Sequence, residues 1–292
     1  MLTASGTAGH GAELERYVAL SSLGAVVVKS LAAFSWPGNP PPRLHPVGHA
    51  MVNSVGLQGP GVRAWLADDL PALERAGARV VASIWGRTID EYAEAAALLA
   101  PVRSNLVVAV ELNLSCPNIG GHRLFAQSAA DAAAVVRAAA VAARPLWAKL
   151  TAVTDDLCTV AGAVLDAGAE AVTLINTVPA MVIDVQSRRP ALGAGGGGLS
   201  GPALHPIAVR CVYDVRAAFP DAPIIGVGGV TTGADAVELL LAGADAIQVG
   251  TATFADPQAP GRVLAELADW CRSHGVARVA DLRGAAQGRN PS

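Results

Sequence analysis

The chain has 292 residues, of which 52% are hydrophobic and only 4% aromatic, and its formal net charge is −3. Lys and Arg form no run, which excludes the basic surface of a nucleic-acid or anionic-membrane binder and leaves a small molecule as the expected partner. No stretch approaches the roughly 20 apolar residues of a membrane span and no signal-peptide pattern opens the chain, so we expect a cytoplasmic protein.

Short β-branched runs alternate with helical patterns along the chain, which predicts parallel strands joined by crossover helices. The predicted strands are Ala25–Val28, Arg79–Ile84, Leu106–Leu112, Leu146–Leu150, Ala171–Ile175, Ile224–Val227 and Ala246–Val249. The clearest predicted helices are Ala129–Ala142, Leu157–Ala167 and Ala234–Ala242. With Met1–Thr3 as a short first strand, residues 1–292 are expected to form one domain, a (β/α)8 or TIM barrel.

Three longer segments follow predicted strands and are expected to be loops on the catalytic face of the barrel. They are Leu31–Leu57, Leu114–Ala126 and Pro179–Gly201. The glycine run at 193–198 fits G-x-G-x-x-G formally, but it follows a polar loop and opens no helix from a strand, so it does not predict a dinucleotide site.

Glycine turns follow the last two predicted strands. Gly226–Gly229 comes after one strand and Gly250–Thr251 after the other. In TIM barrels these two loops commonly bind a phosphate through backbone N–H groups, and glycine lets the backbone approach closely. The alternative is a pair of tight turns without a ligand.

The octapeptide Glu111–Asn118 places Cys116 between Asn113 and Asn118, directly after a buried strand. A thiol there can accept or donate a proton, and the carboxamides can bond to a planar polar ring. The four cysteines of the chain are far apart and form no C-x-x-C pair, which argues against zinc, an iron–sulfur cluster or a disulfide framework. His45 and His49 are separated by a Pro and a Gly, so a metal site there is not expected.

This octapeptide resembles the signature of the dihydroorotate dehydrogenases, flavoproteins of pyrimidine biosynthesis that carry FMN in a TIM barrel. The resemblance covers nearly the whole chain, and its specificity comes from the order and spacing of many short matches. They are Ala4–Gly6, Val28–Ser30, Gly38–Pro40, Asn53–Gln58, Lys149, Ile175–Thr177, Gly198–Pro202, Gly226–Val230 and Gly250–Thr251. Relatives usually begin with some residues more, so the first strand is expected to be truncated.

The resemblance implies a catalytic base, a cofactor site and a substrate site. Cys116 would be the base. The FMN-binding residues would be Ser5, Gly6, Lys29, Ser30, Ser83, Asn113, Lys149, Ile175, Gly201, Gly228, Gly229, Gly250 and Thr251. The substrate-binding residues would be Lys29, Asn53, Ser54, Val55, Gly56, Leu57, Asn113, Asn118, Asn176 and Thr177. Ser83 stands where many relatives carry Asn, and its hydroxyl keeps one donor and one acceptor on a shorter side chain.

The implied reaction is the oxidation of dihydroorotate to orotate, in which a hydride passes from C6 to the flavin and Cys116 accepts the C5 proton. Lys149 ends a strand at the barrel mouth and needs an anionic partner, which the N1–O2 edge of reduced flavin would supply. Lys29 would bind the substrate carboxylate.

Within the family the chain looks most like the NAD-linked type B catalytic subunit. The segments that carry this similarity are residues 183–184, 188–190 and 197–203. That similarity implies a homodimer that joins a separate FAD and iron–sulfur subunit in a heterotetramer. Three alternatives stay open: a fumarate-linked type A enzyme, a tRNA dihydrouridine synthase, which would need a basic RNA-binding surface, and a non-redox aldolase-like barrel with Lys149 as the nucleophile.

Overall fold

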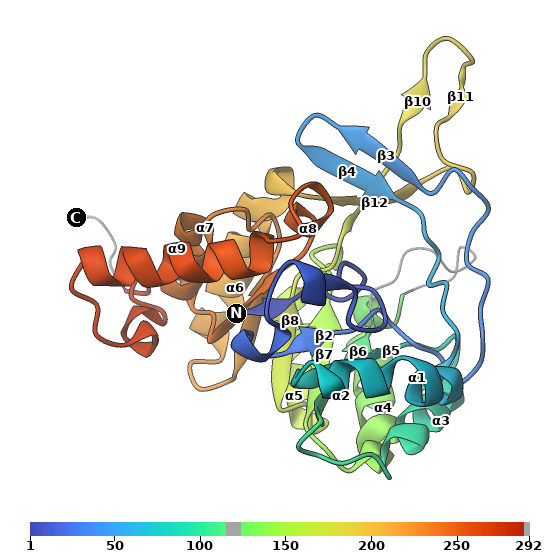
Figure 1. The fold of residues 1–292 in the computed structure, drawn as a ribbon, viewed down its shortest axis with the longest axis horizontal. Helices are drawn as coiled ribbons and strands as arrows, with labels where there is room; N and C mark the ends of the chain where they lie inside the picture. The colour runs from blue at the N-terminus through green and yellow to red at the C-terminus, as the bar shows by residue number, and fades with distance from the viewer. Residues whose placement is uncertain (115–123, 289–292) are drawn as a thin grey trace.

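Eight parallel strands form the centre of the computed structural model, which describes residues 1–114 and 124–288 (Figure 1). The strands are β1 (Leu2–Thr3), β2 (Val26–Val27), β5 (Val80–Ile84), β6 (Val107–Asn113), β7 (Leu146–Leu150), β8 (Ala171–Leu174), β13 (Ile224–Val227) and β14 (Ala246–Val249). Their order is β1-β14-β13-β8-β7-β6-β5-β2, and a parallel bridge between Leu2 and Ala25 brings the two edges together. The predicted TIM barrel is confirmed, with a first strand of two residues.

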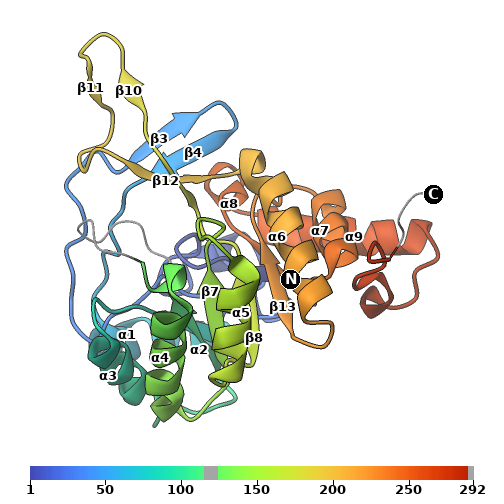
Figure 2. The same cartoon turned by 180° about the vertical axis from the view of Figure 1, so that it is seen from behind.

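The strands form where the sequence has runs of Val, Ile, Leu and Ala that are buried on both faces, as parallel strands require. Helices cover the outside of this sheet (Figures 1 and 2). They are α1 (Val62–Asp68), α2 (Leu70–Arg75), α3 (Ile89–Leu99), α4 (Ala129–Ala139), α5 (Leu157–Asp166), α6 (His205–Ala218), α7 (Gly233–Ala242), α8 (Ala252–Ala255) and α9 (Ala259–Ser273). Short 3-10 helices lie at Glu13–Arg16, Leu20–Ser22, Phe125–Gln127, Ala140–Ala142, Pro202–Leu204 and Val279–Leu282.

Local capping explains several helix boundaries. The side chains of Thr88, Ser128, Asp156 and Thr232 each accept a hydrogen bond from a backbone N–H in the first turn of α3, α4, α5 and α7. At the other end of α7, Gly243 has a φ of 132°, a backbone conformation that favours glycine, and its N–H donates to the carbonyls of Leu239 and Leu240. The predicted helix 129–142 ends in a 3-10 turn at Ala140–Ala142.

Two of the three segments expected to be loops contain strands, so the sequence-based expectation was wrong there. Strands β3 (Leu44–Val47) and β4 (Ala50–Asn53) pair with β12 (Gly197–Ser200) and β9 (Val178–Ala180) in an antiparallel sheet of order β3-β4-β12-β9. A hairpin of β10 (Ile183–Asp184) and β11 (Arg189–Pro190) projects beyond it (Figure 1). Local sequence does not reveal this sheet, because β4 and β12 are far apart in the chain and β12 begins with two glycines.

The antiparallel sheet lies over the end of the barrel at which the strands terminate (Figures 1 and 2). Its β12 strand leads through Gly201 and the 3-10 helix Pro202–Leu204 into α6, so the sheet is anchored next to the loops that follow the barrel strands. Among the described residues, no helix is long and apolar enough to cross a membrane.

Candidate active site

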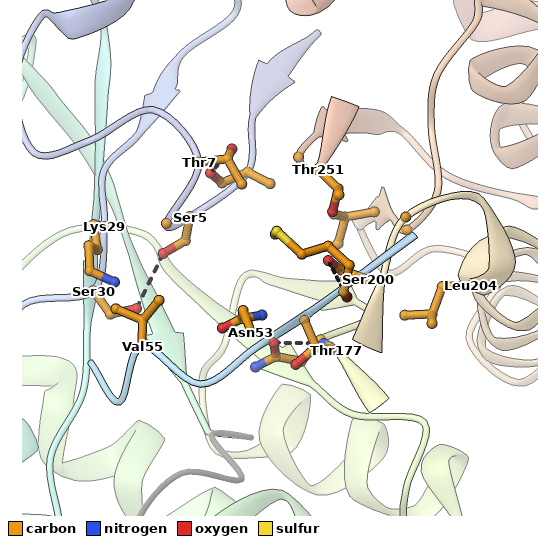
Figure 3. Close-up of a pocket in the computed structure, with 18 of the residues that line it drawn as sticks. Ser5, Thr7, Lys29, Ser30, Asn53, Val55, Thr177, Ser200, Leu204 and Thr251 are labelled. Atoms are coloured by element: carbon orange, nitrogen blue, oxygen red, sulfur yellow. Dashed lines mark hydrogen bonds between the residues drawn. The ribbon is translucent and has the colours of Figure 1, made fainter. Parts of the chain in front are cut away.

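A pocket opens at the carboxyl ends of the barrel strands, under the antiparallel sheet. Figure 3 shows Ser5, Lys29 and Ser30 on one side of it and Ser200, Leu204 and Thr251 on the other. The predicted site residues that line it are Ser5, Gly6, Lys29, Ser30, Asn53, Val55, Gly56, Leu57, Asn113, Lys149, Ile175, Asn176, Thr177, Gly201, Gly228, Gly229, Gly250 and Thr251. The barrel topology therefore gathers side chains from both halves of the sequence around one cavity.

Ser30 is the centre of a hydrogen-bond network on the side of the pocket formed by the early strands. Its Oγ lies 3.2 Å from Ser5 Oγ and 2.9 Å from Ser83 Oγ, and it accepts from Asn113 Nδ2 at 3.2 Å. Ser5 donates to the Val28 carbonyl at 3.1 Å, so Ser30 donates to Ser5 and Ser83 donates to Ser30. Each hydroxyl has one hydrogen, and this assignment satisfies every contact.

Asn113 and Asn176 bond to each other across the ends of β6 and β8. Asn176 Nδ2 donates to Asn113 Oδ1 at 3.0 Å, while Asn176 Oδ1 accepts from the Thr177 N–H at 2.8 Å. Behind them the Tyr92 hydroxyl donates to the Asn113 carbonyl at 2.6 Å. These bonds determine which end of each carboxamide donates, so both groups present fixed polarity to the pocket.

The charged side chains that line the pocket are cationic. Lys29 and Lys149 line it, and none of the described lining residues is Asp or Glu. Burial, followed by the charge of Lys29, lowers the pKa of the nearby His10, so this imidazole adds little positive charge at neutral pH. Two ammonium groups in a concave site favour an anionic ligand such as a phosphate or a carboxylate.

Lys149 has a carboxylate neighbour inside the protein that sequence reasoning did not find. Its Nζ lies 3.8 Å from Glu111 Oε1, and Glu111 is fully buried. Thr173 Oγ1 and Gln248 Nε2 donate to Glu111 Oε2 at 3.1 and 2.9 Å. Alternation in β6 was the available signal, because it places Glu111 on the same side of the strand as Asn113.

The two glycine turns meet at the opposite side of the pocket. Gly228 and Gly229 follow β13, Gly250 follows β14, and the two strands are adjacent in the barrel. In the described part of the chain, no protein acceptor is hydrogen-bonded to the N–H groups of these three glycines. A Cβ at Gly229 would lie 2.7 Å from His205 Cβ, so a side chain there would push the loop into the cavity. These turns can hold a phosphate.

Of the predicted site residues that the structure describes, two do not line the pocket. Ser83 is fully buried and contacts Ser30 Oγ, which lines the pocket, while Ser54 is fully buried and accepts from Asn39 Nδ2 at 2.9 Å. Cys116 and Asn118 lie outside the described residues.

Several lining residues were not predicted. They include Thr7 in the first loop, Leu44 and Met51 in the antiparallel sheet, Ser200, Leu204 and Phe254. Ser200 immediately precedes Gly201 and could have been included from that motif. Leu44 and Met51 carry no local signal, because only the pairing of β4 with β12 brings them over the pocket.

Comparison with known proteins agrees with this geometry. The family model for dihydroorotate dehydrogenase matches residues 1–270. The chain is 46% identical over 288 residues to the catalytic subunit of dihydroorotate dehydrogenase B (NAD(+)) of Desulforudis audaxviator, covering 98% of this chain and 93% of that one. It is 44% identical over 286 residues to a putative dihydroorotate dehydrogenase A (fumarate) of Solibacter usitatus, covering 97% and 93%.

A solved structure also shares the fold. The dihydroorotate dehydrogenase of Eimeria tenella, solved with ferulenol, superposes with a TM-score of 0.79 over 97% of this chain and 84% of the other, at 22% sequence identity. At that identity the likeness concerns the barrel architecture.

Proposed function

The chain belongs to the dihydroorotate dehydrogenase family, a family of oxidoreductases, and we propose that it oxidises (S)-dihydroorotate to orotate with FMN as its cofactor, a step of pyrimidine biosynthesis. One observation carries the proposal: a single pocket combines two lysines, a fixed pair of asparagine carboxamides and glycine turns whose N–H groups meet no hydrogen-bond acceptor among the described residues. Dihydroorotate is a ring of amides with one carboxylate, and FMN adds one phosphate, so the polar groups of the pocket match both molecules.

The residues present fit FMN. Gly228, Gly229, Gly250 and Thr251 would hold its phosphate, and Lys149 would face the N1–O2 edge of the ring, where negative charge develops on reduction. When bound, FMN supplies the acceptor for the hydride that leaves C6 of the substrate. The protein would hold the flavin ring and the substrate ring in the orientation that hydride transfer requires, and it would exclude water from the space between them.

The substrate would lie between the asparagines and Lys29. The Lys29 ammonium would pair with its carboxylate, while Asn53, Asn113 and Asn176 would bond to its ring N–H and C=O groups. Asn53 is held in place by a bond from its Nδ2 to the Gly198 carbonyl at 3.3 Å, which ties the β4 side of the site to β12. Thr177, the residue after Asn176, also lines the pocket.

Cys116 would remove the proton from C5. Although Cys116 lies outside the described residues, it is three positions after Asn113, which lines the pocket at the end of β6. A thiol with its ordinary pKa of about 8.5 is a modest base at neutral pH, so we expect the rate of flavin reduction to rise on the alkaline side.

For the electron acceptor we propose the type B arrangement, with a homodimer of this chain joined to a separate FAD and iron–sulfur subunit that reduces NAD. Several relatives at 41–46% identity are named catalytic subunits of the NAD(+) enzyme, which supports it. The similarly close relative named as a putative fumarate enzyme keeps type A as the second candidate.

The test is anaerobic reduction of the bound flavin. Protein with one FMN per chain should lose its oxidised flavin absorbance when dihydroorotate is added, and orotate should appear in equal amount. Dihydrouracil, which lacks the carboxylate, should reduce the flavin much more slowly because it cannot pair with Lys29. If dithionite bleached the flavin and dihydroorotate did not, the proposed reaction would be wrong.

A further inference from the structure

A buried histidine lies directly behind the glycine turn that follows β13. His205 is the first residue of α6, is 8% exposed and does not line the pocket. Its Nδ1 is 2.9 Å from the Gly228 carbonyl and its Nε2 is 3.1 Å from Glu238 Oε2. The ring therefore connects the glycine turn to α6 and α7, two helices that lie next to each other on the outside of the barrel (Figure 2).

In the contact between His205 Nδ1 and the Gly228 carbonyl, the chemistry of the carbonyl decides which group donates. A carbonyl oxygen only accepts, so the hydrogen lies on Nδ1 and His205 donates to Gly228. The contact of Nε2 with Glu238 Oε2 at 3.1 Å places a carboxylate of α7 on the opposite side of the ring. Glu238 holds the far side of the ring and so fixes its plane.

The bond to Gly228 determines where the next N–H points. In a trans peptide the C=O of one residue and the N–H of the following residue point in opposite directions. Because the Gly228 carbonyl points outward to His205, the Gly229 N–H points the other way, toward the pocket that both glycines line. Two successive glycines place little restraint on the peptide between them, so this orientation needs an external anchor.

Close packing supports the same role. Gly229 has a φ of 68°, and a Cβ added to it would meet His205 Cβ at 2.7 Å and His205 N at 2.8 Å. The backbone and Cβ of His205 therefore pack closely against Gly229, which keeps the start of α6 next to the turn.

We propose that His205 is a positioning residue for the flavin phosphate: it holds the Gly228 carbonyl outward so that the Gly229 N–H is presented to a phosphate oxygen. This inference rests on the proposed FMN site. Glu238 acts one step further out by orienting the imidazole.

The test compares two flavins on the flavin-free full-length protein. FMN and riboflavin differ by the phosphate alone, and the binding of each is followed by quenching of flavin fluorescence. His205→Leu removes both hydrogen bonds. It should raise the Kd for FMN about tenfold or more, the usual worth of a charge-assisted hydrogen bond, and should leave the Kd for riboflavin nearly unchanged.

Two further variants separate positioning from general packing. In His205→Asn the side-chain Nδ2 can take the place of the imidazole Nδ1, so the preference for FMN should recover toward that of the wild type. Ile207→Asn changes an exposed residue of the same helix and should leave both affinities unchanged.

The outcomes distinguish this inference from the proposed function. If the wild-type protein prefers FMN and His205→Leu keeps that preference, or loses affinity for both flavins equally, His205 does not position the phosphate loop. Failure of His205→Asn to recover the preference also overturns the role of the Gly228 bond. A wild-type protein that binds riboflavin as tightly as FMN would instead contradict the phosphate site itself, and with it this inference.

Discussion

The ammonium Nζ of Lys149 lies 3.8 Å from Oε1 of Glu111 inside the barrel, and both side chains are buried. The two strands place them there: Lys149 is opposite Asn113 in the pairing of β6 with β7, and Glu111 is two residues earlier on the same side of β6. The lysine proposed to face the flavin is thus paired on its inner side with a carboxylate. The Lys149 ammonium at the mouth of the barrel is thus partly neutralised by the Glu111 carboxylate, which lies deeper in the barrel.

Removing one member of this pair should destabilise the protein. We expect Lys149→Met to lower the free energy of unfolding of the flavin-free protein by about 3 kcal/mol at neutral pH, because it leaves the Glu111 carboxylate buried without its cation. The double variant Lys149→Met with Glu111→Gln should recover most of that loss. Urea unfolding measures both, and a double variant less stable than the single one would contradict the pairing.

Replacing the proposed base should slow chemistry without removing the flavin. Cys116→Ala should bind FMN and orotate, because the carboxamides and glycine turns remain, while flavin reduction by dihydroorotate should slow by roughly 10²- to 10⁴-fold. Cys116→Ser should retain some activity, with its pH profile shifted to higher pH because a hydroxyl is the weaker acid. Stopped-flow reduction across pH measures this, and a wild-type rate in the alanine variant would exclude Cys116 as the base.

The isolated chain should not use NAD. With dihydroorotate it should reduce artificial dyes, but it should transfer no electrons to NAD, since the four cysteines of the sequence show no iron–sulfur spacing. Adding an FAD and iron–sulfur subunit from a type B relative should restore NAD reduction. Fumarate reduction by the chain alone would favour the type A assignment.

The buried thiol of α6 should resist alkylation. Burial raises the pKa of Cys211 to about 11, with a smaller contribution from Asp214. The thiolate is the reactive form, so at pH 8 only on the order of one Cys211 in a thousand is ionised, and near pH 10 roughly a hundred times more. Peptide mapping after iodoacetamide treatment should find Cys211 unmodified at pH 8 and labelled faster as the pH rises. Equal labelling at both pH values, in folded protein, would contradict the assignment.

Much of the barrel was predictable because its signals are local. The runs at Leu146–Leu150, Ile224–Val227 and Ala246–Val249 are strands with the predicted bounds, since a buried parallel strand needs continuous apolar residues and little else. The turns at Gly228–Gly229 and Gly250–Thr251 were predictable for the same reason, because each directly follows a strand and strand ends meet at one end of a barrel. The predicted turn 226–229 began too early, since Gly226 and Val227 belong to β13.

Other features depend on contacts between distant parts of the chain. No local pattern marks β4 and β12 as partners, yet their pairing brings Met51 and Ser200 over the pocket. Ser54 shares the motif of Asn53 but turns away from the pocket to accept from Asn39, because successive residues in an extended chain point to opposite sides.

The sequence by itself determined the barrel, its family and the residue types at the strand ends. Strand periodicity, glycine turns and short motifs are patterns of residues that are close together in the sequence. Only the tertiary structure decided that Glu111 is the inner partner of Lys149, that Ser83 contacts Ser30, and that His205 donates to the Gly228 carbonyl. The physical reason is that a hydrogen bond or ion pair requires two groups within about 4 Å. For residues far apart in the chain, that distance is set by how the whole barrel closes.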